Sequence, residues 1–341
     1  YFNTVIWTGD GSVGRAITGV GFEPDFVWIK GRENGDPQNH ELFDQVRGVQ
    51  ERVSSNTTAA ETNESDQLTA FGSDGFTVGD SGAVNWDTKT FVAWNWKAGG
   101  APTTDNVAGA GAVPTAGSVK IDGSNLGSAL AGSIAATRLS ANTTAGFSIV
   151  TYTGNGTADA TVGHGLGVAP ELIIQKSLDQ SDQNWIVGSV VLDLTIPWEK
   201  YMKLDTTMAA ADSDFAWNDT PPSATIFTMK DDDANNKSAG TYVTYCFASI
   251  EGYSKVGSYP GNGEATPIVN GPFVYCGFRP AWVLIKSLGH VEDWFMYDNK
   301  RDTYNVEENI LIANTNAAET TDSEDVIDFL SNGFKAVGTG R

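Results

Sequence analysis

The sequence offers few residue types from which a catalytic or metal centre is built. Its only histidines are His40, His164 and His290, and they do not fall at matching positions of the repeat described below. His164 lies in a glycine-rich stretch, GHGLG (163–167), but a phosphate-binding loop must lead into a helix, and here a proline and a strand follow. There is no Gly-x-Ser-x-Gly elbow and no Cys/His pair in a recognisable context. We therefore expect no catalytic residues and no cofactor, and a protein that is not an enzyme.

Carboxylates are abundant, so a glycosidase-like pair of acids is the main catalytic alternative. Four of them recur between two copies of the repeat: Asp44 matches Asp298, and Glu61 matches Glu319. Duplication of a turn or a cap explains such recurrence more simply than duplication of a whole active site. We interpret these acids as structural.

One cluster of oxygen-bearing side chains suggests calcium. Asp231, Asp232 and Asp233 are followed by Asn235 and Asn236, which are hard ligands of the kind that calcium prefers. Their spacing matches no known calcium loop. A solvated turn is the favoured interpretation, and a structural calcium site is the alternative.

Tryptophan is the residue type most suited to binding sugars, because its flat ring stacks on a pyranose. The chain has ten tryptophans, and most are expected in the core, as are Trp28 and Trp282 in apolar strands. Trp217 differs because it opens a turn-like segment, WNDTPP (217–222). Trp217 is thus the one candidate glycan contact that the sequence indicates.

Composition narrows the class of partner. The formal net charge is −21, and nucleic-acid affinity rests largely on Lys and Arg, so nucleic acid is excluded as a partner. The longest apolar runs are strand-sized and too short to cross a bilayer, so no membrane span is expected. Charged residues make up only 18% and glycine fills 38 positions, which is typical of short strands joined by polar turns.

The two cysteines, Cys246 and Cys276, each lie in an apolar, strand-like run. Two buried free thiols are favoured, and a disulfide is the alternative, because sequence alone does not place their Cα atoms.

An internal repeat organises the chain. Each copy has a strand with a Gly-bearing turn, then a proline at the mouth of a second apolar strand that ends in lysine. The copies are 5–11 (VIWTGDG) with 21–30 (GFEPDFVWIK), 149–156 (IVTYTGNG) with 168–176 (VAPELIIQK), and 256–263 (VGSYPGNG) with 277–286 (GFRPAWVLIK). The common phase predicts equivalent sites for Phe26, Leu172 and Trp282.

The repeat predicts four segments: a first copy at 1–97, a Gly/Ala/Ser/Thr-rich linker or arm at 98–146, a second copy at 147–253 and a third at 254–341. The linker implies one flexible joint, whereas copies two and three abut and should form a stiff pair. The third copy stops before its last strand, and the chain opens at Tyr1 without a Met or signal-peptide pattern. We therefore expect a fragment of a longer protein.

Short strands, frequent turns and the lack of a crossover helix predict an all-β fold of tandem antiparallel β-sandwiches, jelly-roll-like, with the third repeat incomplete. The proline-led strand is apolar on both faces. It should therefore lie centrally in its sheet, covered on one face by the opposing sheet and on the other by loops or a neighbouring domain.

Several phrases resemble an uncharacterised tandem-repeat family of marine bacteriophage virion proteins, often described as tail-fibre-like. They are GFSIVTYTGNG (146–156), VGHGLGVAP (162–170), GPFVYCGFRPAWV (271–283), FLSNGFK (329–335) and FVAWNWKAGG (91–100). The resemblance covers nearly all of the chain outside the linker. It implies a location in the virion, an extracellular particle, and no particular binding or catalytic residue.

These observations predict a phage virion structural protein, a tail-fibre or appendage component whose loops bind a host surface or pack between subunits. Its expected partners are other virion proteins, further copies of the chain in a homo-oligomer, and a host surface glycan or receptor. The alternatives are a capsid or tail decoration protein, a polysaccharide depolymerase and a secreted bacterial adhesin.

Overall fold

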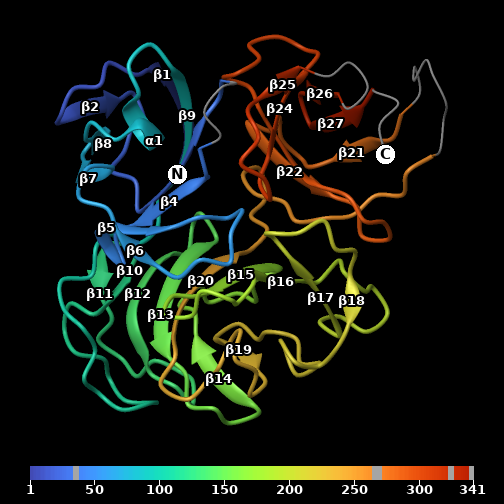
Figure 1. Ribbon diagram of the computed structural model, residues 1–341. Coiled ribbons are helices and arrows are strands. Elements are labelled where there is room, and N and C mark those ends of the chain that lie inside the picture. Colours follow the sequence, from blue (N-terminus) through green and yellow to red (C-terminus); the bar gives the residue numbers. More distant parts are fainter. Residues whose placement is uncertain (34–37, 263–270, 322–325, 338–341) are drawn as a thin grey trace.

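The fold is described from a computed structural model, for residues 1–33, 38–262, 271–321 and 326–337. Within these residues the chain forms 27 strands and one short helix, α1 (Gly82–Asn85). The predicted all-β, sandwich-type fold is confirmed. Figure 1 shows three lobes, which we call the first unit (1–97), the second unit (98–253) and the third unit (254–337). In this part of the chain no helix has the length and hydrophobicity to span a membrane.

The first unit is a sandwich of two antiparallel sheets. Its inner sheet has the order β1-β9-β3-β4-β5-β6 and its outer sheet the order β2-β8-β7. One core joins the facing sides of both sheets and includes Trp7, Val27 and Phe76. The strands are β1 (Phe2–Thr8), β2 (Arg15–Thr18), β3 (Phe26–Gly31), β4 (Glu41–Asp44), β5 (Gly48–Val53), β6 (Thr62–Asn63), β7 (Leu68–Gly72), β8 (Gly75–Val78) and β9 (Thr90–Trp96).

The second unit repeats this plan with a wider inner sheet, in the order β11-β10-β12-β13-β20-β15-β16-β17-β18, and an outer pair, β14 and β19. The strands are β10 (Val119–Ile121), β11 (Ser124–Asn125), β12 (Ala136–Asn142), β13 (Phe147–Thr153), β14 (Ala160–Gly163), β15 (Leu172–Ser177), β16 (Ile186–Ser189), β17 (Lys200–Lys203), β18 (Ala211–Asp212), β19 (Ile226–Met229) and β20 (Thr241–Phe247).

The prediction of a linker or arm at 98–146 is wrong. This segment supplies β10, β11 and β12, and β12 pairs antiparallel with β13 of the same chain. Its small side chains are what the packing needs: a Cβ on Gly99 would lie 2.5 Å from the Ala141 carbonyl oxygen. The segment therefore widens the second unit's sheet. β10 and β12 run parallel, an exception to the antiparallel prediction.

The third unit has an outer sheet, β21-β27-β26, and an inner sheet, β22-β23-β24-β25. The strands are β21 (Phe273–Tyr275), β22 (Trp282–Lys286), β23 (Trp294–Asp298), β24 (Asn309–Ile312), β25 (Thr320–Thr321), β26 (Ile327–Leu330) and β27 (Gly333–Ala336). Residues 256–262 form no strand, contrary to the repeat pattern, because the described residues place no counterpart of β9 or β20 beside them. Gly263 and Arg341 lie outside the described residues.

The proline-led strands explain how the units fit together. In β3, Val27 and Ile29 face the first unit's own core, whereas Phe26 and Trp28 face a second core that all three units share. β15 and β22 send Ile174 and Leu284 into that same shared core. The prediction that both faces of this strand are covered is confirmed. The predicted central place holds for β3 and β15, whereas β22 has a neighbour on one side only among the described residues.

Three equivalent backbone hydrogen bonds join the units in a cycle. In each, the amide directly before the last strand of one inner sheet (β6, β18 or β25) is the donor. The acceptor is a carbonyl just beyond the proline-led strand of the next unit. Glu61 joins the first unit to the second, Ala210 the second to the third, and Glu319 the third to the first; their acceptors are Leu178 (2.8 Å), Leu288 (2.9 Å) and Arg32 (2.8 Å).

The repeat lysines close the same cycle. Each ammonium group donates to a loop carbonyl of the preceding unit: Lys176 to Thr58 (3.1 Å), Lys286 to Thr207 (3.3 Å) and Lys30 to Asn316 (3.3 Å). Burial lowers the pKa of Lys30 and of Lys176 to about 8. A third set uses ring nitrogens, with Trp185, Trp294 and His40 donating to the carbonyls of Ser54, Lys203 and Ile312. The first unit thus contacts both others, and the predicted flexible joint is wrong.

An ion pair is buried at the junction of the first and second units and at the junction of the third and first units. Asp44 and Arg47 lie 2.5 Å apart at the junction of the first and second units, where the Tyr245 hydroxyl also donates to Asp44. Asp298 and Arg301, 2.6 Å apart, stand equivalently at the junction of the third and first units, where Asp298 accepts from Trp94. The second unit has Ser189 and Leu192 at these positions, and Ala210 at the position of Glu61.

We expect Arg47→Leu to lower the free energy of unfolding by about 3–5 kcal/mol, because it leaves Asp44 buried without its counter-charge. The matched control is the triple variant Asp44→Ser, Arg47→Leu, Glu61→Ala, which copies the second unit. It should lose at least about 2 kcal/mol less than the single variant, because no buried charge remains. Urea unfolding measures both, and equal losses would contradict the role given to the pair.

Candidate functional site

Trp217, the glycan contact expected from the sequence, is not available to a ligand. It is 1% exposed and meets Trp198 edge to face, with ring centroids 5.4 Å apart. A glycine on the neighbouring strand makes the room, since a Cβ on Gly188 would lie 2.4 Å from the Trp217 ring. Residues 214–219 form a turn, as the sequence predicts, but the indole of Trp217 points into the core.

The expected oxygen cluster does not converge on a common point. The side chains of Asn235 and Asn236 are buried and donate to the backbone carbonyls of Ala216 and Thr157. Asp232 accepts from the amide of Ala234, and Asp233 pairs with Lys237 at 3.4 Å. Within the described ranges no group of three or more His, Cys, Asp or Glu side chains is arranged to hold a metal ion.

The remaining candidates are structural in this fold. Cys246 is a buried free thiol and Cys276 a half-buried one, so the disulfide alternative is wrong. Asp44 accepts from the amides of Val46 and Arg47, and Asp298 caps its own turn in the same way. Of the histidines, His40 and His164 are buried and His290 is exposed.

His40 holds a junction as a neutral ring. Its Nδ1 accepts from the Trp28 indole at 2.8 Å, so the proton is on Nε2, which donates to the carbonyl of Ile312 at 2.9 Å. Burial is the main reason why the pKa of His40 lies well below its ordinary value, and the positive charge of Lys30 lowers the pKa further. Charging this ring is therefore costly in the folded chain.

The stability contributed by His40 should be lost in acid. Below pH 6.5 the unfolded chain binds a proton at His40 that the folded chain refuses, so unfolding is favoured as pH falls. The difference in unfolding free energy between the wild type and His40→Gln should shrink by up to about 1.4 kcal/mol per pH unit between pH 6.5 and 5. Urea unfolding at several pH values tests this, and a constant difference would mean that His40 titrates alike in both states.

Trp86 is the exposed tryptophan. All ten lie in the described residues, and Trp86 is 43% exposed where eight of the others are buried and Trp282 is half-buried. It follows directly on α1, whose last residue, Asn85, is buried. The Asn85 side chain accepts from the amide of Asp10 at 3.1 Å and donates to the carbonyl of Ser12 at 2.9 Å. This anchor fixes where the indole emerges.

The second unit shows that the fold does not require the indole. There Asn236 makes the same anchor, accepting from the amide of Asn155 and donating to the carbonyl of Thr157. The next residue is Lys237, which is exposed. Gly9 and Gly154 confirm the equivalence, because a Cβ on either would collide with the carbonyl oxygen of Trp86 or Lys237 respectively. An exposed tryptophan at this place is therefore a property of the first unit, not of the architecture.

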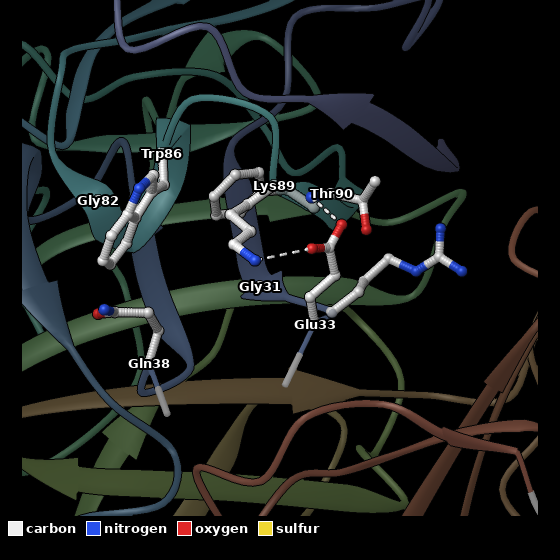
Figure 2. Close-up of a pocket in the computed structure, with 9 residues that line it drawn as sticks. Gly31, Glu33, Gln38, Gly82, Trp86, Lys89 and Thr90 are labelled. Atoms are coloured by element: carbon white, nitrogen blue, oxygen red, sulfur yellow. Dashed lines mark hydrogen bonds and ion pairs between the residues drawn. The ribbon is translucent and has the colours of Figure 1, made fainter. Parts of the chain in front are cut away.

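The indole borders a shallow pocket between α1 and the neighbouring ends of β3 and β9 (Figure 2). The Trp86 ring stands on one side, with the Gln38 side chain near it and the Lys89 and Glu33 side chains across from it. The pocket encloses only about 20 Å³, so a ligand would lie against its walls rather than inside it. Its lining residues are Gly31, Arg32, Glu33, Gln38, Gly82, Trp86, Lys89, Thr90 and Phe91.

The charges around the pocket are already paired. Lys89 and Glu33 lie 3.2 Å apart, and Arg32 forms a bidentate pair with Glu319 of the third unit. Hydrogen bonds from Lys89 and Thr90 lower the pKa of Glu33. A general acid for glycoside cleavage needs the opposite shift. The acids with strongly raised pKa values, Asp25 and Glu41 at about 7 and Glu307 at about 8, do not line this pocket.

The site therefore combines one accessible aromatic face with a neutral amide and a compensated ion pair. Such a surface suits a ligand that has an apolar face and several hydroxyl groups. Sequence reasoning missed Trp86, although a comparison of Asn85-Trp86 with Asn236-Lys237 would have drawn attention to it.

Fold and site together define an all-β protein of three linked sandwich units, with a shallow pocket beside an exposed tryptophan on the first unit. The chain belongs to the family described as Domain of unknown function (DUF7483), whose model matches residues 1–123 and 118–340. The second match spans two structural units. No curated protein and no solved structure is significantly similar to the chain.

Proposed function

We propose that this protein is a structural component of a bacteriophage virion, in a tail fibre or other appendage, and that its first unit binds a neutral glycan of the host surface. The observation that carries the binding role is the exposed indole of Trp86, at a position where the second unit has Lys237. The virion role is supported by the resemblance of the repeat phrases to phage tail-fibre-like proteins.

The charge balance favours a neutral over an acidic glycan. The chain carries a formal charge of −21, which repels anions at low salt. The two cations of the pocket, Lys89 and Arg32, are held by Glu33 and Glu319, so neither is available to neutralise a ligand. Hydroxyl groups of a sugar would find the Gln38 amide and the outer lone pairs of Glu33. Binding without cleavage agrees with the lowered pKa of Glu33.

Binding to an array of neutral and acidic oligosaccharides tests the glycan role. We expect the wild type to bind neutral sugars, and Trp86→Ala to bind them at least tenfold more weakly, because stacking on the indole is lost. Tyr304→Ala is the matched control, since Tyr304 is an exposed aromatic residue of another unit. Trp86→Lys copies the second unit and should keep the wild-type unfolding free energy. Unchanged binding by both Trp86 variants would contradict this site.

The virion role is tested on purified particles. We expect antibodies against the first unit to label an appendage in electron micrographs and to block adsorption of the phage to its host. Labelling over the capsid surface or along the tail, without an effect on adsorption, would instead make the chain a decoration protein.

A further inference from the structure

The second unit has a pocket of its own, with a volume of about 250 Å³ against about 20 Å³ for the pocket beside Trp86. Its walls come from β16 and β17, from the residues just before β16, and from two segments on either side of β19. A cavity of about 150 Å³ holds a benzene molecule, so this pocket has room for one six-membered ring with its substituents. The lining residues that matter below are Gln183, Asn184, Tyr201, Lys203, Phe215 and Asp232.

In the first unit an ion network occupies the equivalent space. There Arg52 lies 3.1 Å from Glu41 and 3.0 Å from Glu64. The strand registers and the matching backbone hydrogen bonds place Ile186, Tyr201 and Ser213 at the positions of Glu41, Arg52 and Glu64, in that order. None of these replacements can form the network, and the serine is too short to fill the place of the glutamate. The pocket is therefore a property of the second unit's own sequence, not of the repeated architecture.

One wall of the pocket is aromatic. The rings of Tyr201 and Phe215 meet edge to face, with centroids 4.3 Å apart. Tyr201 and Lys203 alternate along β17 with Met202, which is buried in the shared core, so both point to the pocket side of the sheet. Burial, and after it the charge of Asp232, raises the pKa of Tyr201. Its hydroxyl therefore stays protonated and can donate a hydrogen bond.

The other groups of the pocket can bind a polar ligand. Within the described residues the Lys203 ammonium forms no ion pair and no hydrogen bond, unlike Lys89 at the pocket of the first unit. One carboxylate oxygen of Asp232 accepts from the amide of Ala234 at 2.8 Å, which leaves the second oxygen as an acceptor. The Asn184 amide nitrogen donates to Asp205 at 2.8 Å, so its carbonyl oxygen is an acceptor too.

We propose that this pocket binds one hexuronic acid ring, a sugar unit with several hydroxyl groups and one carboxylate. The Lys203 ammonium pairs with the carboxylate, and the apolar side of the ring lies against Phe215. Sugar hydroxyls donate to Asp232 and Asn184 and accept from Tyr201. A neutral hexose would make these hydroxyl contacts but leave Lys203 without a counter-charge. The site is independent of the one proposed in the first unit.

The net charge of the chain does not exclude such an anion. A formal charge of −21 repels anions at long range, but at physiological salt this repulsion is screened beyond about 8 Å. The Lys203 pair would form at contact distance, where screening is weak. At the pocket of the first unit the cations are already held by acids, so the same reasoning favours a neutral ligand there and an acidic one here.

Two matched pairs of monosaccharides test the proposal on the unmodified protein: galacturonate with galactose, and glucuronate with glucose. In calorimetric titrations we expect at least one uronate to bind at least tenfold more tightly than its neutral partner, because charge-assisted hydrogen bonds are about twice as strong as neutral ones. That uronate should slow amide exchange in residues 201–203 and 232–236, and Trp86→Ala should bind it like the wild type. Affinities within threefold for both pairs, no binding, or binding without this protection would overturn the proposal.

Protein variants then assign the contacts. Lys203→Met keeps the apolar stem and should lower the affinity for the uronate at least tenfold, to that for the neutral sugar. Lys200→Met is the matched control, because Lys200 lies on the same strand but pairs with Asp193 at 2.9 Å and does not line the pocket. Urea unfolding checks that both are folded. A folded Lys203→Met that keeps the preference, or an equal loss in Lys200→Met, would be incompatible with the proposed role of Lys203.

A third variant and a longer ligand complete the test. Tyr201→Phe keeps the ring contact with Phe215 but removes the hydroxyl, so it should weaken uronate binding and retain the preference over the neutral sugar. Unchanged uronate binding would contradict the assigned contact. A uronic acid trimer distinguishes two sources of the ring. Binding as tight as that of the monosaccharide would support the end of a polysaccharide as the ligand, and loss of binding would support the free sugar.

Discussion

The structure depends on a sheet that is apolar on both faces. One face of each inner sheet is covered by the outer sheet of its own unit, but the other face carries residues such as Phe26, Trp28 and Ile174, which water would otherwise meet. Burial of one such side chain is worth about 1.5–3 kcal/mol. When the three inner sheets pack around one core, this apolar face is covered in all three of them. A single unit, taken alone, would expose an aromatic surface.

The polar contacts between units follow from this packing rather than causing it. Loop amides, lysines and ring nitrogens all bind backbone carbonyls, which every sequence has, so the same junction can be made three times by diverged repeats. The side chains that differ between the three junctions are those that take no part in these contacts to backbone carbonyls. Two junctions bury an Asp–Arg pair, and the second unit replaces it with Ser and Leu, an exchange that costs little because both charges go together.

The sequence allowed the fold class and the local phase to be predicted, because both depend on short-range pattern. The equivalence of Phe26, Leu172 and Trp282 and the capping role of Asp44 follow from spacing alone. The strands within 98–146 did not follow from spacing, because a strand of small residues has the composition of a linker. Only the structure shows that Gly99 lies so close to a neighbouring strand that it has no room for a side chain. The sequence pointed to Trp217 as the glycan contact, and did not point to Trp86, for a related reason. Exposure of an indole is decided by distant packing, here by Gly188, and not by the flanking residues.

Duplication explains why function would concentrate in single units. When a junction is repeated three times, most positions are constrained in all copies. A residue with a new role can then arise only at a position that the repeated contacts do not use. The position directly after the buried asparagine is of this kind, because the asparagine makes its hydrogen bonds without help from the next side chain. This position holds Trp86 in the first unit and Lys237 in the second. A ligand can therefore be bound at this position without disturbing the contacts that hold the units together.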